Sequence, residues 1–377
     1  MPSSPRLSIE TSLAALDPGQ WNALAGDQPF VRHEFLSALH DTGCAAPDTG
    51  WTPYFLTLRR GERLAGAVPL YLKMHSRGEY VFDFAWADAF ERHGLRYYPK
   101  LLSAIPFTPV AGARLLAADD ADRVLLAQGL VELAQRLKVS SLHLLFPYPQ
   151  DLAALREAGY MIREGVQFHW TNPGYADMDQ FLAAMSHDKR KKIRQDRKKV
   201  AAAGITYRWL TGAQIDAASL DFFYRCYCQT YYEHGNPPYL NDAFFARIRA
   251  ELPDSMVLVL AMRGDEPVAA ALNLRGGGAL YGRYWGSAEY VPGLHFETCY
   301  LQAIEYCIVH GLSRFEGGAQ GEHKMARGLL PTPTWSAHWV ADRRFADAIQ
   351  DFLDHETTAM QRYVGELETH APFKRVD

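Results

Sequence analysis

Hydrophobic and polar positions follow the same order in both halves of the chain. Residues 54–72 form an apolar run, a charged turn that contains Gly61, and a second apolar run, and residues 256–274 repeat this pattern with Gly264 in the turn. Two apolar strands joined by a short glycine-containing turn predict a β-hairpin. After each hairpin come a helical pattern, a strand, a short helix and a final strand. Five elements in one order indicate an internal duplication.

The elements after the hairpins set the expected fold. A helical pattern runs from about Arg123 to Lys138 ahead of a strand at 141–146, and its counterpart runs from about Glu297 to His310 ahead of a strand at 313–318. A chain of 377 residues is too long for one typical core. We therefore predict α/β architecture with mixed sheets in two tandem domains. Their predicted bounds are residues 1–175 and 176–377.

A proline-rich run in the first half, RYYPKLLSAIPFTPVAG, has no counterpart in the second half. Pro99, Pro106 and Pro109 argue against a long helix or a central strand, because proline lacks the backbone N–H donor. We predict an ordered loop, which in a compact domain usually shapes a site. Its candidate substrate-binding residues are Tyr98, Lys100 and Thr108.

A strongly basic segment lies between the two halves. Residues 187–199 contain eight Lys or Arg and two Asp, whereas the whole chain has a net charge of −4. Asp179 as N-cap and Gly204 as the stop predict one amphipathic helix over about 179–203, with a basic exposed face. Its thin apolar stripe consists of Phe181, Met185, Ile193 and Val200.

The basic face has two explanations. It is either a solvated surface or a site for an anionic partner, because a phosphate backbone relieves the repulsion between clustered cations. No aromatic residues interleave with the charges, so base recognition is not predicted. The candidate phosphate- or RNA-binding residues are Lys189, Arg190, Lys191 and Arg194.

Polar residues crowd the turn after the strand at 313–318. Catalytic groups often lie where a strand meets a loop, and a surface turn rarely needs Gln, Glu, His and Lys together. On the preceding helix, Glu305 is expected to be partly buried, whereas a favourable interaction with the helix dipole already explains Glu297. The candidate residues of the turn are Glu316, Gln320, Glu322, His323, Lys324 and Arg327.

Composition and motifs exclude several classes. Five cysteines without a repeated spacing predict free thiols and a cytoplasmic protein. No secretory signal or membrane-spanning run is visible. His295, Glu297 and His323 are too weak a set to predict a metal site. There is neither a G-x-S-x-G elbow nor a P-loop, so hydrolases and nucleoside triphosphatases lack support.

Several motifs carry a family resemblance. The order of elements, together with LREAGYMIREGVQFHW at 155–170, is similar to the later part of a GNAT acyltransferase domain. The motif K-R-x-x-I-R-x-x-x-K at 189–198 and LYGRYWGSA at 280–288 resemble the Fem-type peptidoglycan-branching enzymes. The runs at 97–116 and 294–331 resemble a bacterial group of Fem-like predicted N-acyltransferases. This resemblance covers nearly the whole chain and implies two tandem GNAT-like domains in a Fem-type arrangement.

Two donors are compatible with this resemblance. GNAT enzymes hold the pyrophosphate of acetyl-CoA at a helix N-terminus. Here Glu297 stands at that place in the second copy, and Asp119, Asp120 and Asp122 stand there in the first. Carboxylates repel a pyrophosphate. Because Fem-type enzymes take amino acids from aminoacyl-tRNA, this donor is favoured over acyl-CoA.

The resemblance implies N-acyl transfer, in which a neutral amine attacks an activated acyl ester and an amide forms. Glu322, His323 and Glu305 are candidate bases, and Lys324 or strand-edge N–H groups would stabilise the oxyanion. Tyr98, Lys100 and Thr108 would bind the amine-bearing acceptor, for which a cell-wall precursor is one candidate. The further substrate-binding candidates are Tyr284, Trp285, His295, Glu297, Tyr300, Gln302, Glu316, Gln320 and Arg327.

Two alternatives stay open at this point. One is an acyl-CoA-dependent GNAT that acts on a small amine, and the other is a non-catalytic RNA-binding protein that uses the basic helix alone. The polar residues of the 316–327 turn favour an enzyme. Aminoacyl-tRNA or acyl-CoA is expected as a co-substrate, with no permanently bound cofactor, no DNA partner and no transmembrane segment.

Overall fold

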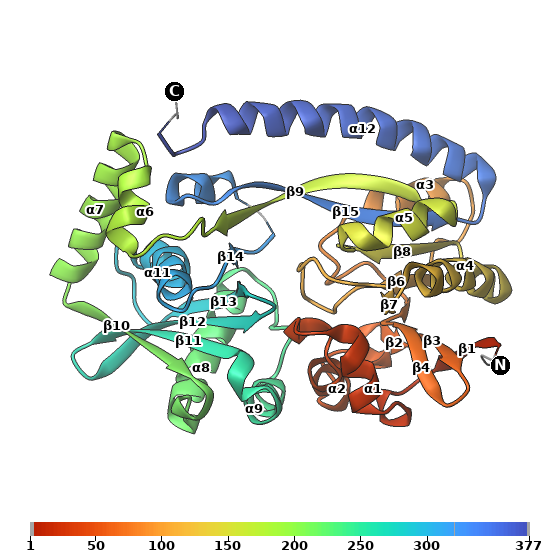
Figure 1. Cartoon of the computed structure of the whole chain (residues 1–377), viewed down its shortest axis with the longest axis horizontal. Helices are drawn as coiled ribbons and strands as arrows, with labels where there is room; N and C mark the ends of the chain where they lie inside the picture. The colour runs from red at the N-terminus through yellow and green to blue at the C-terminus, as the bar shows by residue number, and fades with distance from the viewer. Residues whose placement is uncertain (1–3, 320, 375–377) are drawn as a thin grey trace. The chain divides into compact units, whose positions relative to one another are not determined.

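The computed structural model describes residues 4–319 and 321–374 and has a mixed α/β fold (Figure 1). Its internal contacts group the chain into two compact units. Unit 1 comprises residues 1–166 and 333–363, and unit 2 comprises residues 167–332 and 364–377.

Unit 1 contains two groups of paired strands. The first has the order β1-β3-β4-β7, and the second has the order β15-β8-β6-β5-β2, in which β15 spans Leu330–Val340. β6 and β8 are parallel, and their other neighbours are antiparallel. The strands of unit 1 are β1 (Pro5–Glu10), β2 (Trp51–Pro53), β3 (Phe55–Arg60), β4 (Arg63–Val68), β5 (Tyr71–Lys73), β6 (Lys100–Ser103), β7 (Leu116–Ala117) and β8 (Ser141–Leu145). Its helices are α1 (Pro18–Ala25), α2 (His33–Asp41), α3 (Phe84–Arg92), α4 (Asp120–Leu137) and α5 (Pro149–Glu157).

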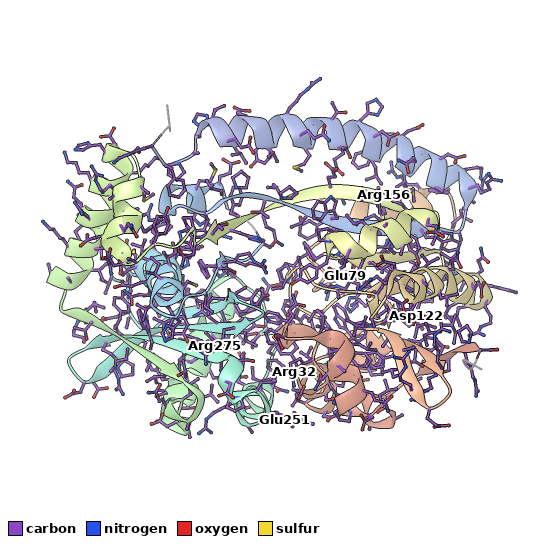
Figure 2. All side chains as sticks on the ribbon, in the orientation of Figure 1. Arg32, Glu79, Asp122, Arg156, Glu251 and Arg275 are labelled. Atoms are coloured by element: carbon purple, nitrogen blue, oxygen red, sulfur yellow. The ribbon has the colours of Figure 1, made fainter. Side chains whose placement is uncertain are left out.

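The α4 helix carries the core of unit 1. Its N-cap is Asp119, whose side chain accepts a hydrogen bond from the backbone N–H of Asp122. Leu126, Leu130 and Leu133 recur at helical spacing and are buried in the main hydrophobic cluster of this unit. The buried Asp122, labelled in Figure 2, pairs with Arg60 at 2.7 Å, which ties the helix to the β3–β4 hairpin.

The proline-rich run departs from the sequence prediction. Its middle part forms β6, which lies between β8 and β5 and is therefore a central strand. Pro99 and Pro106 lie on either side of the four strand residues, so neither proline removes a hydrogen bond from the ladder. The prediction of a loop throughout this run was wrong for Lys100–Ser103.

Unit 2 has the strand order β10-β11-β12-β13-β14-β9. The four strands from β10 to β13 are antiparallel neighbours, β13 and β14 are parallel, and β14 is antiparallel to β9. Helices α8 and α11 lie on opposite faces of this sheet (Figure 1). The strands are β9 (Met161–Thr171), β10 (Ile205–Thr211), β11 (Met256–Arg263), β12 (Glu266–Gly276), β13 (Ala279–Ser287) and β14 (Arg314–Glu316). The helices are α6 (Met178–Ala184), α7 (His187–Ala202), α8 (Ala217–Glu233), α9 (Asp242–Glu251), α10 (Leu294–Phe296) and α11 (Gln302–Val309).

The basic segment forms two helices, whereas the sequence predicted one. The α6 helix begins at the N-cap Asp177 and ends before Met185, whose backbone is extended, and α7 starts at His187. Met185 is fully buried, so its side chain fills the core at the break. Phe181, Ile193 and Val200 are buried as the apolar stripe required, but the stripe runs over two helices.

Two strands carry the chain from one unit to the other. β9 starts in unit 1, and its last residues pair with β14 in unit 2. β15 (Leu330–Val340) starts in unit 2, and its last residues pair with β8 in unit 1. Residues 333–363, which include most of α12 (Arg343–Thr369), therefore group with unit 1. The domain bounds predicted from the repeat, residues 1–175 and 176–377, divide the chain by its internal duplication, and they stay a prediction.

Candidate functional site

A small cavity opens in unit 2 where two parallel strands separate. β13 and β14 pair only as far as Tyr281 opposite Glu316. The chain then turns away through Gly317 and Gly318, while β13 continues to Ser287. A cavity of about 160 Å³ lies at this separation, and we name it the strand-gap cavity. Four side chains predicted from the sequence line it, namely Tyr284, Trp285, His295 and Tyr300.

Lys324 has a buried amine beside this cavity. Its Nζ donates a hydrogen bond to the carbonyl oxygen of Gly318 at 3.0 Å, and Gly318 lines the cavity. Lys324 belongs to the 3₁₀ turn Glu322–Arg327, where the side chain is only 3% exposed. Burial lowers the pKa of the Lys324 amine to about 8, because desolvation disfavours the ammonium form. The ammonium ion still predominates at neutral pH and is directed at the Gly317–Gly318 turn.

Glu316 is the last residue of β14, and its side chain is buried in the protein interior. Its Oε1 pairs with Arg314 at 3.0 Å, and its Oε2 lies 3.8 Å from His169 Nε2. Burial raises the pKa of the Glu316 carboxyl to about 7, against the effect of Arg314. The sequence placed Glu316 among the substrate-binding candidates, and the structure places it at the C-terminal end of β14, just before the turn that borders the cavity.

The helix beside the cavity contains a π-helical turn. Gly293, with a positive φ of 87°, precedes α10, so the helix begins at Leu294 rather than at Glu297 as predicted. Residues Glu297–Leu301 form the π turn, which inserts an extra residue and is often found at functional sites. Tyr300 in this turn and His295 before it both face the strand-gap cavity.

Glu297 and Glu305 share one arginine that the sequence analysis missed. Arg197 of α7 contacts Glu297 at 3.1 Å and Glu305 at 2.7 Å. Gln302 donates to the same Glu297 oxygen at 2.9 Å and accepts from the Trp209 indole at 3.0 Å. Burial raises the pKa of Glu297, and Arg197 opposes that shift. The expected partial burial of Glu305 is confirmed, since 30% of its side chain is exposed.

His323 and Arg327 lie against the aromatic side of the helix. The His323 ring is 5.8 Å from the Phe296 ring and 6.2 Å from Tyr300, between ring centroids. Partial desolvation of the largely exposed His323 ring and the neighbouring Lys324 lower the pKa of His323, so its imidazole is neutral at pH 7 and can accept a proton. Arg327 stacks over Phe296 at 4.5 Å.

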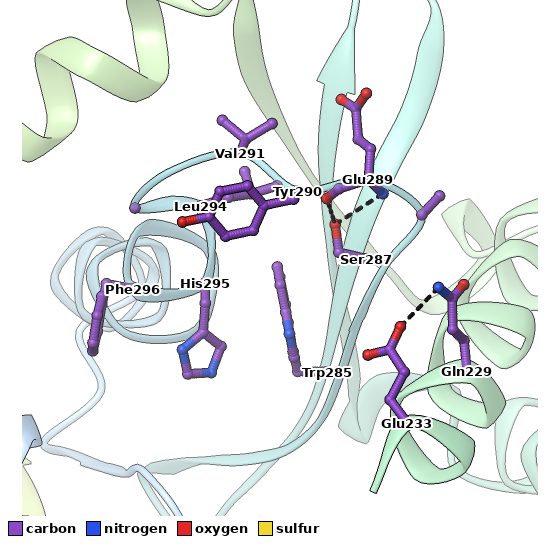
Figure 3. A pocket seen from close by; sticks show the side chains of 12 residues that line it. Gln229, Glu233, Trp285, Ser287, Glu289, Tyr290, Val291, Leu294, His295 and Phe296 are labelled. Carbon is purple, nitrogen blue, oxygen red and sulfur yellow. Dashed lines mark hydrogen bonds between the residues drawn. The ribbon is translucent and has the colours of Figure 1, made fainter.

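A second, larger pocket of about 540 Å³ adjoins the strand-gap cavity and shares Trp285 and His295 with it (Figure 3). We name it the aromatic pocket, because Trp285, Tyr290 and Phe296 form much of its wall. Glu233 of α8 also lines it. Burial, with His323 and Lys324 nearby, lowers the pKa of His295 to about 4, so this ring is neutral at pH 7.

The basic helix α7 carries a pocket of its own, with a volume of about 360 Å³. We name it the basic pocket. Three of the four predicted phosphate-binding residues line it, and Lys189 does not. Arg194 also pairs with Asp179 at 3.2 Å. The lining residues are His187, Arg190, Lys191, Arg194, Gln195 and Lys198.

Lys100 is held inside unit 1. Its amine donates to Ser76 Oγ and Glu79 Oε2, each at 2.7 Å, and to Asp83. These bonds use all three donors of the ammonium group. Burial raises the pKa of Glu79, which is labelled in Figure 2, to about 7, against the effect of Lys100. Binding of an acceptor by Lys100 stays a prediction.

Tyr98 and Thr108 also lie in unit 1. The Tyr98 hydroxyl is 2.8 Å from Ser76 Oγ, and the buried Thr108 hydroxyl donates to the carbonyl oxygen of Pro106 at 3.0 Å. Their proposed role in acceptor binding stays a prediction.

The remaining candidates are placed as follows. Glu322 and His323 are exposed at the start of the 3₁₀ turn. Gln320 lies outside the described residues. Glu233 was not among the residues predicted from the sequence, and the structure adds it to the aromatic pocket. Helical spacing could have pointed to Arg197, which lies four residues after the buried Ile193 and therefore on the inner face of α7.

The described residues hold neither a metal-binding cluster nor a membrane-spanning helix. They contain no group of three or more His, Cys, Asp or Glu side chains that could hold a metal ion. No helix among them has the length and apolar character needed to cross a membrane.

Comparison with known proteins adds a family and a set of similar folds. A FemAB-like family, described as peptidoglycan biosynthesis/recognition, matches residues 12–375. The solved structure of FemX has a TM-score of 0.55 at 12% identity, covering 89% of this chain and 98% of that chain. L-PGS from Bacillus licheniformis has a TM-score of 0.56 at 9% identity, covering 92% and 98%. The C-terminal domain of a putative lysylphosphatidylglycerol synthetase from Agrobacterium fabrum has a TM-score of 0.55 at 12% identity, covering 90% and 96%.

These matches confirm two sequence expectations, the Fem-like resemblance and the mixed α/β class with a Fem-type fold. No curated protein matches the sequence. At such low identities the solved structures show the fold alone, and the family and fold together support assignment as a transferase.

Proposed function

Because the chain belongs to the FemAB-like family of peptidoglycan biosynthesis and recognition proteins, we propose that it transfers an aminoacyl group from a tRNA ester to an amine. The acceptor that this family suggests is an amine-bearing peptidoglycan precursor. The reacting groups would meet at the strand-gap cavity, which four of the sequence-predicted residues line.

The chemistry follows from charges at the cavity. The amine nitrogen attacks the ester carbonyl carbon, an N–C bond forms, and the C–O bond to the ribose breaks with release of a ribose hydroxyl. Negative charge develops on the carbonyl oxygen during the attack. The Lys324 ammonium group would stabilise that charge, because it is already desolvated and fixed by Gly318.

The attacking amine must also lose a proton. His323 suits this role, because its ring is neutral at pH 7 and lies beside Tyr300 of the cavity wall. The leaving ribose oxygen takes up a proton, so the reaction consumes none overall. Glu305 is less suitable, because Arg197 holds its carboxylate at 2.7 Å.

The basic pocket is the observation that favours aminoacyl-tRNA as the donor. Four of its six lining residues are Lys or Arg, and none is an acid. This arrangement suits the phosphate groups of an RNA backbone, which release counterions when cations neutralise them. Acyl-CoA is the competing donor, and its binding is an outcome of the experiments below.

A pair of matched lysine variants tests the donor. Lys191→Gln/Lys198→Gln removes two charges from the basic pocket, and Lys192→Gln/Lys199→Gln removes two exposed charges from the same helix outside that pocket. Both pairs are seven residues apart. We expect the pocket variant to lower affinity for charged tRNA and to reduce the slope of log affinity against log salt by about 1.5.

The control variant should retain most of the wild-type affinity and salt slope. Equal losses in the two double variants would show that α7 attracts RNA only through its overall charge. Unchanged tRNA affinity in both would remove α7 from donor binding.

A further inference from the structure

The aromatic pocket differs in charge from the basic pocket of the same unit. Two carboxylates line it, and its described lining residues include no lysine or arginine. Glu289 pairs with Arg263 at 2.6 Å, so its charge is already compensated. Glu233 meets one donor among the described residues, the neutral amide of Gln229 at 2.9 Å. Within the described part of the chain, Glu233 therefore brings to this pocket a carboxylate without a cationic partner.

The wall opposite this carboxylate is aromatic. Figure 3 shows the Glu233 carboxylate directed from α8 toward Trp285, with Tyr290 and Phe296 on other sides of the pocket. The Tyr290 side chain is 90% exposed, so its ring is accessible to a ligand from solvent. Aromatic faces attract cations, and a carboxylate beside them supplies a charged acceptor.

The pocket walls are held together by short contacts. The Thr230 hydroxyl, one turn before Glu233, donates to the carbonyl oxygen of Trp285 at 3.0 Å. Gly286 follows Trp285 and lies so close to α8 that an added Cβ would be 2.1 Å from the carbonyl oxygen of Cys226. These contacts fix Glu233 and Trp285 relative to each other before a ligand arrives, and such preorganisation favours affinity.

We infer that the aromatic pocket binds the cationic side chain of the transferred amino acid, as in a lysyl or arginyl donor. This inference rests on the proposed function and names its acyl group. The ester carbonyl would lie in the strand-gap cavity by Lys324, and the side chain would extend past Trp285 and His295, which the two spaces share.

The side chain is a better partner for Glu233 than the α-amine of the donor. The α-nitrogen is only two bonds from the ester carbonyl carbon, so it stays close to the strand-gap cavity. Glu233 lines the aromatic pocket and does not line that cavity. A long side chain with a terminal cation spans that separation.

Calorimetric titration of the full chain tests the inference with two small probes. L-Lysinamide and L-norleucinamide share the α-ammonium group and the length of the aliphatic chain, but only lysinamide has a terminal ammonium. We expect wild-type protein to bind lysinamide at least about tenfold more tightly. Glu233→Gln should abolish this preference. Asp221→Asn removes a charge from the same helix away from the pocket and should preserve it.

Each other outcome overturns the inference. Equal binding of both probes to wild-type protein, or an unchanged preference in Glu233→Gln, would show that the Glu233 carboxylate does not bind the cationic side chain of the amino acid. Equal weakening of both probes in Glu233→Gln would assign the carboxylate to the α-ammonium instead.

Failure of the proposed function has a different signature. Charged tRNA would then not bind the protein, while the preference for lysinamide would persist. Failure of the inference alone would leave tRNA binding intact with no preference between the probes.

Discussion

Replacing Lys324 by methionine separates the stability of the protein from its chemistry. The Lys324 amine is buried, and burial lowers its pKa from the ordinary 10.5 to about 8. A group that is charged in the unfolded chain but resists charge when folded destabilises the native state below its folded pKa. Lys324→Met removes this penalty, although it leaves the Gly318 carbonyl oxygen without its donor.

The sign and size of the pH effect follow from the two pKa values. Below pH 8 both states are charged, and the full penalty of about 3 kcal/mol applies. Between pH 8 and 10.5 the folded amine loses its proton first, so wild-type stability rises with pH. From pH 7 to pH 9.5 this rise is about 2 kcal/mol, and Lys324→Met should lack it.

Urea denaturation of both proteins at pH 7 and pH 9.5 measures this difference. We expect the gap in unfolding free energy between wild type and variant to change by about 2 kcal/mol in favour of wild type at the higher pH. The same variant should lose about a hundredfold in transfer rate, as expected when a donor to the oxyanion is removed. Parallel stability curves at the two pH values would refute the buried ammonium, and full transfer activity would refute its role in the chemistry.

Two further predictions concern how the site is held together. Gly286→Ala should destabilise the protein by about 2 kcal/mol or more, because the added Cβ would clash with the α8 backbone at Cys226. The control Gly365→Ala, whose added Cβ meets nothing within 4 Å, should be neutral or slightly stabilising. Thermal unfolding compares the two variants, and equal midpoints would contradict the close approach of Gly286 to α8. Arg197→Met should lower the unfolding free energy by about 3 kcal/mol, because it leaves the buried Glu297 carboxylate without its ion-pair partner. Urea denaturation measures this loss, and adding Glu297→Gln should recover part of it. A loss below about 0.5 kcal/mol would show that Glu297 does not need the arginine.

The order of elements could be predicted because each strand and helix has its own periodicity. The hairpins with Gly61 and Gly264 in their turns are β3–β4 and β11–β12, and both glycines have positive φ values. The predicted α/β class followed from that order. What the pattern did not show was pairing between distant segments, such as β14 with β9, because register depends on contacts far apart in sequence.

Two predictions from local sequence patterns were wrong at segments that are buried in the structure. The four residues Lys100–Ser103, between Pro99 and Pro106, are enough for a central strand, and the fully buried Met185 ends one helix just before the basic helix starts. Neither feature changes the periodicity of its neighbours, so the sequence pattern alone indicated a loop and a continuous helix.

The candidate site could be predicted by residue type but not by geometry. The sequence indicated Lys324, His323 and Glu305 as polar residues close to an apolar helix. It could not show that Arg197 restrains Glu305, or that Glu233 of α8 lies in a pocket with Trp285, because those contacts join elements about 50 or more residues apart. Charge counts along a segment likewise did not distinguish the inward-facing Arg197 from the exposed lysines of α7.

Binding of the purified protein to charged tRNA and to acetyl-CoA, each at low and physiological salt, tests the central claim most directly. The proposed transfer from an aminoacyl-tRNA predicts tRNA binding that weakens steeply with salt and no saturable binding of acetyl-CoA. Saturable acetyl-CoA binding without tRNA binding would contradict it and would make the chain an acyl-CoA-dependent transferase.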